Sequence, residues 1–186
     1  MLKKSLLCGA LALVAMNPLV SSAADTAKAT VKTVKMERTD AEITAAIKGL
    51  YAESALNKAS DIQVETRNHE VELIGNLKTD LQYADAVALA QSVDGVEDVK
   101  AKKLVVEGSK APLADTYITA KAKGTIMKEK LFGSKAVEYW PVSFETKDGI
   151  LYVTGKVDTD KERENIVNLV KRIHGVKDVK STITVK

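Results

Sequence analysis

The chain has 186 residues, with 28 lysines and arginines against 25 aspartates and glutamates, and a formal charge of +3. Its single cysteine, Cys8, lies in an N-terminal stretch that we expect to be removed, so the mature chain has no thiol for a disulfide, a metal ligand or a nucleophile. Loss of Lys3 and Lys4 with this stretch lowers the charge to +1, and a nearly neutral protein lacks the concentrated basic surface that bulk nucleic-acid binding requires.

Residues 1–24 have the order of a secretory signal peptide. Two lysines precede an apolar run from Leu6 to Val20, and small residues follow up to Ala24. The run is too short and too early to favour a membrane span, so we expect cleavage after Ala23 or Ala24. Lipidation of Cys8 is the alternative, and Leu7 disfavours it because that processing needs a small residue there.

Residues 25–38 form a basic segment with few apolar anchors, which predicts a flexible chain. Its basic residues are Lys28, Lys32, Lys35 and Arg38. This segment either tethers the protein to anionic lipid, at about 1 kcal/mol per basic residue near such a surface, or is a solvated spacer.

The rest of the chain contains an internal repeat. Residues 61–80 return as residues 141–160, and the same offset of 80 carries Gly95-Val96 onto Gly175-Val176 and Leu104-Val105 onto Thr184-Val185. Residues 40–45 match residues 115–120 at an offset of 75, so the second copy holds about five extra residues within 131–141. The pattern predicts two tandem small domains, at 39–108 and 114–186, joined by a linker at 109–113.

Each copy shows the same order of predicted elements. A capped amphipathic helix comes first and begins at Thr39 in the first copy; two alternating strands with a type I′ turn between them follow, at Asn68-His69 and at Asp148-Gly149. A second capped helix, which begins at Thr79 or Thr159, and a last strand complete the unit. We therefore expect an α+β fold of two α-β-β-α-β domains, each with two helices packed on one face of a three-stranded mixed sheet.

The first helix of the second copy has two apolar stripes instead of one. Ile118 and Ala122 continue the stripe that the first copy also has. A second stripe is equally well spaced and consists of Tyr117, Ala120, Gly124, Met127 and Leu131. Two stripes predict a helix that is covered on two sides.

The capped first helix, the hairpin that ends in Val/Leu-x-Gly-x-Val/Leu, and the Gly-Val-x-x-Val before the last strand resemble the BON domain (bacterial OsmY and nodulation). The resemblance implies a periplasmic, stress-associated protein of Gram-negative bacteria that binds phospholipid or acts as a chaperone. It attaches no enzymatic activity and no cofactor to the domain.

The residues themselves contain no recognisable catalytic or metal motif. His69 and His174 fall at non-equivalent positions of the repeat, and neither has a second ligand at metal spacing. Gly75 and Gly155 are spaced as turn glycines and form no phosphate loop. We therefore expect a protein that is not an enzyme and holds no metal or cofactor.

One segment of the second copy combines basic and aromatic residues, as a site for an anionic lipid surface does. Its members are Lys121, Lys123, Lys128, Lys130, Phe132, Tyr139 and Trp140. The competing interpretation places the aromatic rings in the core or between the domains and the lysines on a solvated helix face. At about 100° per residue, Lys121 and Lys128 also lie nearly opposite Lys123 and Lys130.

The sequence favours two functions. The first is peripheral binding of anionic phospholipid through the second domain. The second is an ATP-independent holdase that shields apolar segments of unfolded client proteins. Salt distinguishes them, because screening weakens lipid binding of this kind and leaves apolar capture in place. Docking of a protein partner at an exposed strand edge is a third option.

Overall fold

The computed structural model describes residues 38–58, 61–109, 113–133 and 140–186. The expected signal peptide, residues 25–37, the linker residues 110–112 and residues 134–139 of the insertion lie outside the described residues. None of the helices in the described part is long and apolar enough to cross a membrane.

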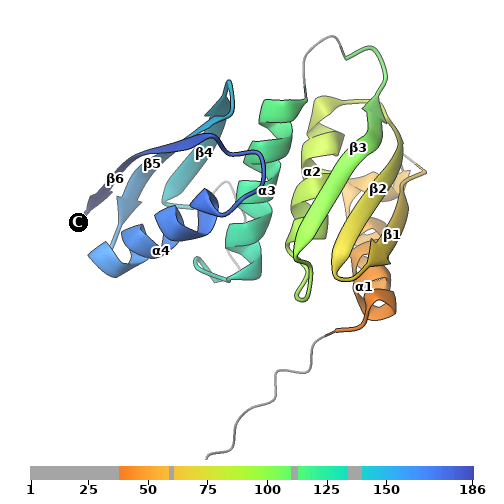
Figure 1. Ribbon diagram of the computed structural model, residues 1–186, viewed down its shortest axis with the longest axis horizontal. Coiled ribbons are helices and arrows are strands. Elements are labelled where there is room, and N and C mark those ends of the chain that lie inside the picture. Colours follow the sequence, from red (N-terminus) through yellow and green to blue (C-terminus); the bar gives the residue numbers. More distant parts are fainter. Residues whose placement is uncertain (1–37, 59–60, 110–112, 134–139) are drawn as a thin grey trace, which may run out of the picture. The chain divides into compact units, whose positions relative to one another are not determined.

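Each half of the described chain forms a three-stranded mixed sheet with helices packed on it (Figure 1). The first half consists of α1 (Asp40–Glu53), the 3-10 helix η1 (Ala55–Lys58), β1 (Gln63–Arg67), β2 (Glu70–Leu77), α2 (Asp80–Gln91) and β3 (Asp98–Val106). The second half consists of α3 (Ala114–Lys128), β4 (Val142–Lys147), β5 (Ile150–Val157), α4 (Asp160–Lys171) and β6 (Asp178–Val185). The strand orders are β1-β2-β3 and β4-β5-β6, antiparallel in the first pair of each sheet and parallel in the second. The predicted fold class is confirmed.

The helix starts follow the predicted capping pattern in full only at α1, and α3 begins after Leu113 with no side-chain cap. Thr39 and Glu42 form the predicted reciprocal capping box. The side chains of Thr79 and Thr159 accept hydrogen bonds from the N–H groups of Gln82 and Glu162. The side chains of Gln82 and Glu162, however, accept from the N–H of the residue before the cap, Lys78 or Asp158. The reason is backbone geometry, because φ is −140° at Thr79 against −70° at Thr39, which turns the N–H of Thr79 elsewhere.

The hairpins have the predicted type I′ geometry. Both central residues have positive φ, at 50° and 63° for Asn68 and His69 and at 54° and 81° for Asp148 and Gly149. A carboxylate from the first helix of each domain accepts hydrogen bonds from both backbone N–H groups of the turn. Asp40 binds the turn of the first domain at 2.8 and 2.9 Å, and Asp115 binds that of the second at the same distances.

Two details of the repeat differ from the sequence alignment. A bulge in β3 inserts one residue, since Glu72 pairs with Lys100 but Ile74 pairs with Lys103. Leu104 therefore corresponds to Ile183, and its predicted match with Thr184 is wrong by one residue. Gly155 is not a turn glycine; it lies inside β5, where a Cβ would come within 2.1 Å of the Pro141 carbonyl oxygen.

Candidate functional site

Helix α3 belongs to the second domain but also packs against α2 of the first domain (Figure 1). Ala120 of α3 is buried within the hydrophobic core of the first domain, and Tyr117 packs against that core. The two helices approach so closely at Gly124 that a Cβ there would lie 2.4 Å from the Ala88 carbonyl oxygen. Tyr117, Ala120 and Gly124 of the second predicted stripe therefore lie on the side that meets the first domain, whereas Leu131 follows the helix and packs on the core of the second domain.

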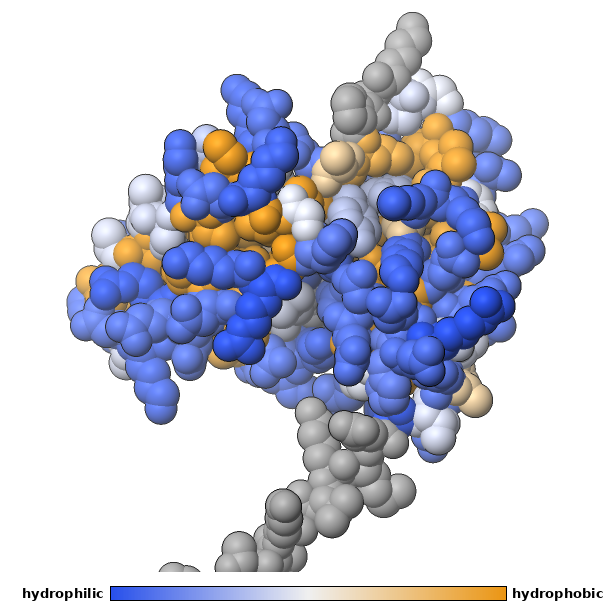
Figure 2. Space-filling view, viewed as in Figure 1, coloured by the Kyte–Doolittle hydropathy of each residue, from blue (hydrophilic) through white to orange (hydrophobic). Residues whose placement is uncertain are grey.

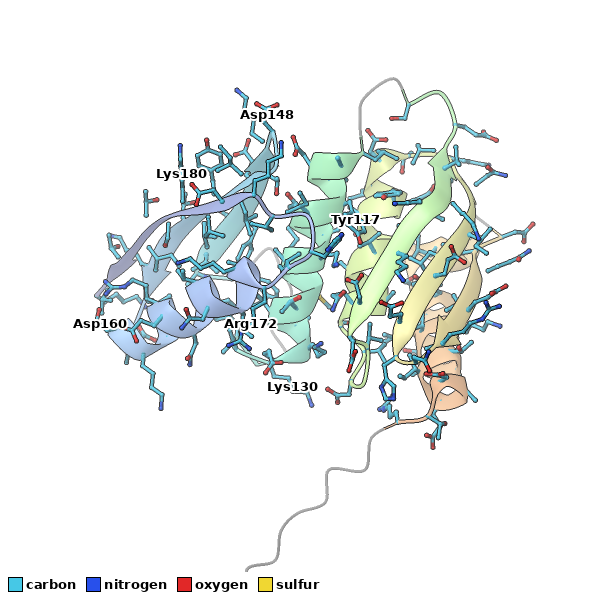
Figure 3. The ribbon with its side chains drawn as sticks, in the orientation of Figure 1. Tyr117, Lys130, Asp148, Asp160, Arg172 and Lys180 are labelled. Carbon is cyan, nitrogen blue, oxygen red and sulfur yellow. The ribbon has the colours of Figure 1, made fainter. Side chains whose placement is uncertain are left out.

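Lys121 lies inside this interface. Only 2% of the residue is exposed, and its ammonium group forms an ion pair with the Asp98 carboxylate at the start of β3. The ammonium also lies 5.2 Å from the centre of the Tyr117 ring. The Tyr117 hydroxyl donates to the Val99 carbonyl, and burial raises the pKa of this phenol, with the nearby Asp98 acting in the same direction (Figure 3). A buried ammonium needs such partners, because the cost of removing it from water is several kcal/mol, on the order of the whole stability of a domain.

The other lysines of α3 divide between two sides of the helix. Lys128 donates to the Val96 carbonyl oxygen at 2.9 Å, so it contacts the first domain as Lys121 does. Lys123 lies on another side and lines a cleft. Lys130 is exposed just beyond the C-terminal end of α3 (Figure 3). The four lysines do not form a single strip.

The described aromatic residues of the insertion pack on the core of the second domain. The ring centres of Phe132 and Trp140 lie 5.3 Å apart, and Trp140 meets Phe144 edge-on at 6.2 Å. Phe132 and Trp140 are only partly buried. Tyr139 lies outside the described residues.

The two copies of the repeat differ where the domains meet. On the outer face of α2, Ala84 and Ala88 leave room for α3. The corresponding residues of α4 are Glu164 and Asn168, and both are exposed, as expected of a helix face that meets solvent. Figure 2 shows apolar surface over the second domain between α4 and β6. On the first domain, α3 packs beside the corresponding side, which lies between α2 and β3. This contrast between the copies was visible in the sequence and would have located the interface.

A cleft of about 960 Å³ runs between the domains along α3. The first domain contributes apolar side chains of α2 to one wall, among them Leu81 and Leu89. Met127 of α3 also lines the cleft, and the second domain further contributes β4 with the preceding Trp140. The Leu81 residue is 69% exposed. Among the described residues, one other large apolar residue is exposed, Val105, and it lies outside the cleft.

The charged groups of the cleft are two carboxylates, Asp85 and Glu145, and one ammonium, Lys123. Partial desolvation at the cleft wall raises the pKa of Asp85, and Lys123 acts on it in the opposite direction. No group of three His, Cys, Asp or Glu side chains that could hold a metal ion occurs in the part of the chain that the structure describes. His69 instead hydrogen-bonds through its Nδ1 to the Gly95 carbonyl oxygen, a contact that joins the first hairpin to the turn after α2.

Chemically, the cleft offers apolar surface, a few hydroxyls and a strand edge. Such groups are suited to binding through apolar contact and hydrogen bonds. Sequence reasoning could not name the residues of the cleft, because its walls come from segments far apart in the chain.

Comparison with known proteins gives the family. The BON domain matches residues 39–108 and again 114–186. The chain is 31% identical to osmotically-inducible protein Y of Escherichia coli (strain K12) over 147 aligned residues. The alignment covers 79% of this chain and 73% of that protein.

Solved structures of CdsD, a structural protein of the type III secretion system of Chlamydia trachomatis, are more distant. The C-terminal domain of CdsD matches with 16% identity and a TM-score of 0.32, over 80% of this chain and 68% of that one. A second CdsD structure gives a TM-score of 0.33 at the same identity, over 80% of this chain and 64% of that one. Together, the two domain matches and the protein Y relative confirm the resemblance seen in the sequence: this chain belongs to the BON domain family and carries the domain twice in tandem.

Proposed function

We propose that this protein acts in the periplasm under osmotic stress, without enzymatic activity, by holding extended segments of unfolded proteins in the cleft between its two domains. The name of its Escherichia coli relative supports the link to osmotic stress. The observation that carries the binding function is the cleft, which exposed Leu81 of the first domain lines together with β4 of the second.

The character of the cleft supports a polypeptide more than a small metabolite. Its apolar side chains come from both domains, and only three of its lining residues are charged. An open groove of this kind accepts many sequences, as a holdase must, because apolar contact carries little directional information.

The test is a delay of client aggregation by residues 25–186 in the absence of ATP. We expect suppression at near-equimolar protein, with little change between 0.1 and 1 M salt, since screening does not weaken apolar contact. Leu81→Glu should abolish most of the effect by placing a charge in the cleft. Val105→Glu is the matched control, because Val105 is also exposed, at 52%, but lies outside the cleft. Equal activity of the two variants would contradict this proposal.

A second candidate function is binding of anionic phospholipid by the second domain, and the charge distribution supports it. Residues 39–108 hold seven lysines and arginines against thirteen aspartates and glutamates, a charge of −6. Residues 114–186 hold fourteen against ten, a charge of +4. An anionic membrane attracts the second domain and repels the first, so the protein would approach the bilayer in one orientation.

Within the predicted lipid site, the groups best available to a headgroup are Lys123, Lys130 and the partly buried rings of Phe132 and Trp140. Lys121 and Lys128 are engaged with the first domain, so their substitution would disturb the interface as well. Co-sedimentation with phosphatidylglycerol-rich and with neutral liposomes tests this function. Salt-sensitive binding to the anionic set that Lys130→Glu weakens would support it, and equal binding to both sets or to neither would rule it out.

A further inference from the structure

The strand β4 has one edge that no described residue pairs with. In the sheet, β4 pairs only with β5, in an antiparallel register from Val142↔Gly155 to Lys147↔Ile150. The two-residue turn makes Lys147 and Ile150 a hydrogen-bonded pair, and the bond from Lys156 N–H to the Pro141 carbonyl shows that this alternation continues to the start of the strand. The N–H and C=O groups of Ser143 and Glu145 therefore point to β5.

The opposite edge follows from the same alternation. The N–H and C=O groups of Val142, Phe144 and Thr146 point away from β5, which gives three donors and three acceptors in a row. Such an edge is a template for a further strand. Successive residues of β4 from both faces of the sheet line the cleft, so the cleft runs along this edge.

The cleft beside the edge has a volume of about 960 Å³ and side chains that an added strand could contact. Neighbouring strands lie about 4.8 Å apart, and side chains on one face of an added strand point the same way as Val142 and Phe144. Val142 and Phe144 pack in the core that α3 shares, and the apolar lining of the cleft includes Met127 of α3 and Leu81 and Leu89 of α2. Asp85 lies on the same wall of the first domain. The other side chains of the added strand would point outward beside Ser143 and Glu145.

We propose that the occupant of the cleft is an extended polypeptide segment that adds to β4 as a fourth strand, with apolar residues at alternate positions and a lysine or arginine that meets Asp85. This inference rests on the proposed holdase function and specifies its mode of binding. Main-chain hydrogen bonds to β4 supply affinity without regard to sequence, and the apolar wall selects alternating segments. Two carboxylates against one ammonium in the cleft favour a basic side chain over an acidic one.

The test uses a ten-residue peptide that alternates valine and threonine and carries one central lysine. In a strand of either direction, only one of the two alternating sets of peptide N–H groups faces β4. We expect N-methylation of one set, either on the valines or on the threonines, to weaken binding at least tenfold, while methylation of the other set leaves it nearly unchanged. Amide hydrogen exchange of Val142, Phe144 and Thr146 should slow when the unmodified peptide binds.

Asp85→Asn tests the charge preference in the same assay. The wild-type protein should prefer the lysine peptide to its norleucine counterpart several-fold, and the variant should lose this preference while it still binds the norleucine peptide. Equal effects of the two methylated peptides, or unchanged exchange of the three β4 amides on binding, would overturn strand addition. If aggregation is still suppressed in a Leu81-dependent way, the holdase function survives that outcome; if suppression is also absent, both proposals fail.

Discussion

The ammonium group of Lys121 on α3 forms an ion pair with the carboxylate of Asp98 at the start of β3, and both belong to the surface where the two domains meet. The Lys121 side chain is 3% exposed and that of Asp98 is 24% exposed. This pair, with the Tyr117 and Lys128 hydrogen bonds to β3 and its preceding turn, connects the second domain to the first. The contact holds α3, which lines the cleft, against the first domain.

Loss of the Lys121 charge should destabilise the protein. Lys121→Met keeps the apolar stem but leaves Asp98 without its cation, and we expect a loss of about 3 kcal/mol, the low end for a broken buried pair because Asp98 keeps some exposure. Asp98→Asn in the same chain should restore part of this loss. Urea denaturation of the two single variants and the double variant measures the coupling free energy. A coupling near zero would mean that the pair does not hold the interface.

Two glycines at equivalent positions of the repeat should respond to alanine with opposite signs. Gly124→Ala places a Cβ 2.4 Å from the Ala88 carbonyl oxygen, so the helices must separate; we expect a cost of about 1–3 kcal/mol despite the better helix propensity of alanine. Gly49 lies in α1, with no atom within 4 Å of the added Cβ, and Gly49→Ala should stabilise by about 0.5–1 kcal/mol. Changes of the same sign in the urea midpoint would contradict close packing of α2 and α3.

The hairpin contact of Asp40 should make stability depend on pH. Hydrogen bonds from the backbone N–H groups of His69 and Asn68 hold the pKa of Asp40 below its usual value of 3.8. A lowered folded pKa means that this contribution is fully present above about pH 4 and is lost as pH falls through the folded value. Urea midpoints at pH 6 and pH 3 measure the loss, and Asp40→Asn should show a smaller one. An equal loss in the variant would show that this carboxylate does not carry the effect.

Much of the fold could be predicted because it is encoded locally and twice. The capping residue Thr39 and the dipeptide Asp148-Gly149 are short-range signals that need no knowledge of the partner element. The bulge in β3 could not be placed, because the sequence between Lys100 and Lys103 carries no signal that tells one extra residue from a regular strand.

The site was harder to predict because it depends on which face of α3 meets the other domain. The spacing of Lys121 and Lys123 indicated that they lie on two sides of the helix. The sequence could not show which of the two lysines is buried in an ion pair, because buried and solvated lysines occur at the same helical spacings. The informative signal was the contrast between Ala88 and its repeat counterpart Asn168, since only a helix covered by another helix needs the small residue. The cleft itself has no sequence pattern, because distant segments form its walls.

The most direct test of the account is to locate a bound client on the protein. Residues 25–186 contain no cysteine, so a photoreactive crosslinker can be attached at a single introduced one. Leu81→Cys places it in the cleft, and Lys161→Cys places it at the equivalent position of α4, on an exposed face. We expect an aggregating client to crosslink to the protein labelled at residue 81 and not to the protein labelled at residue 161. Equal crosslinking at both positions, or crosslinking at residue 161 alone, would contradict a client site in the cleft.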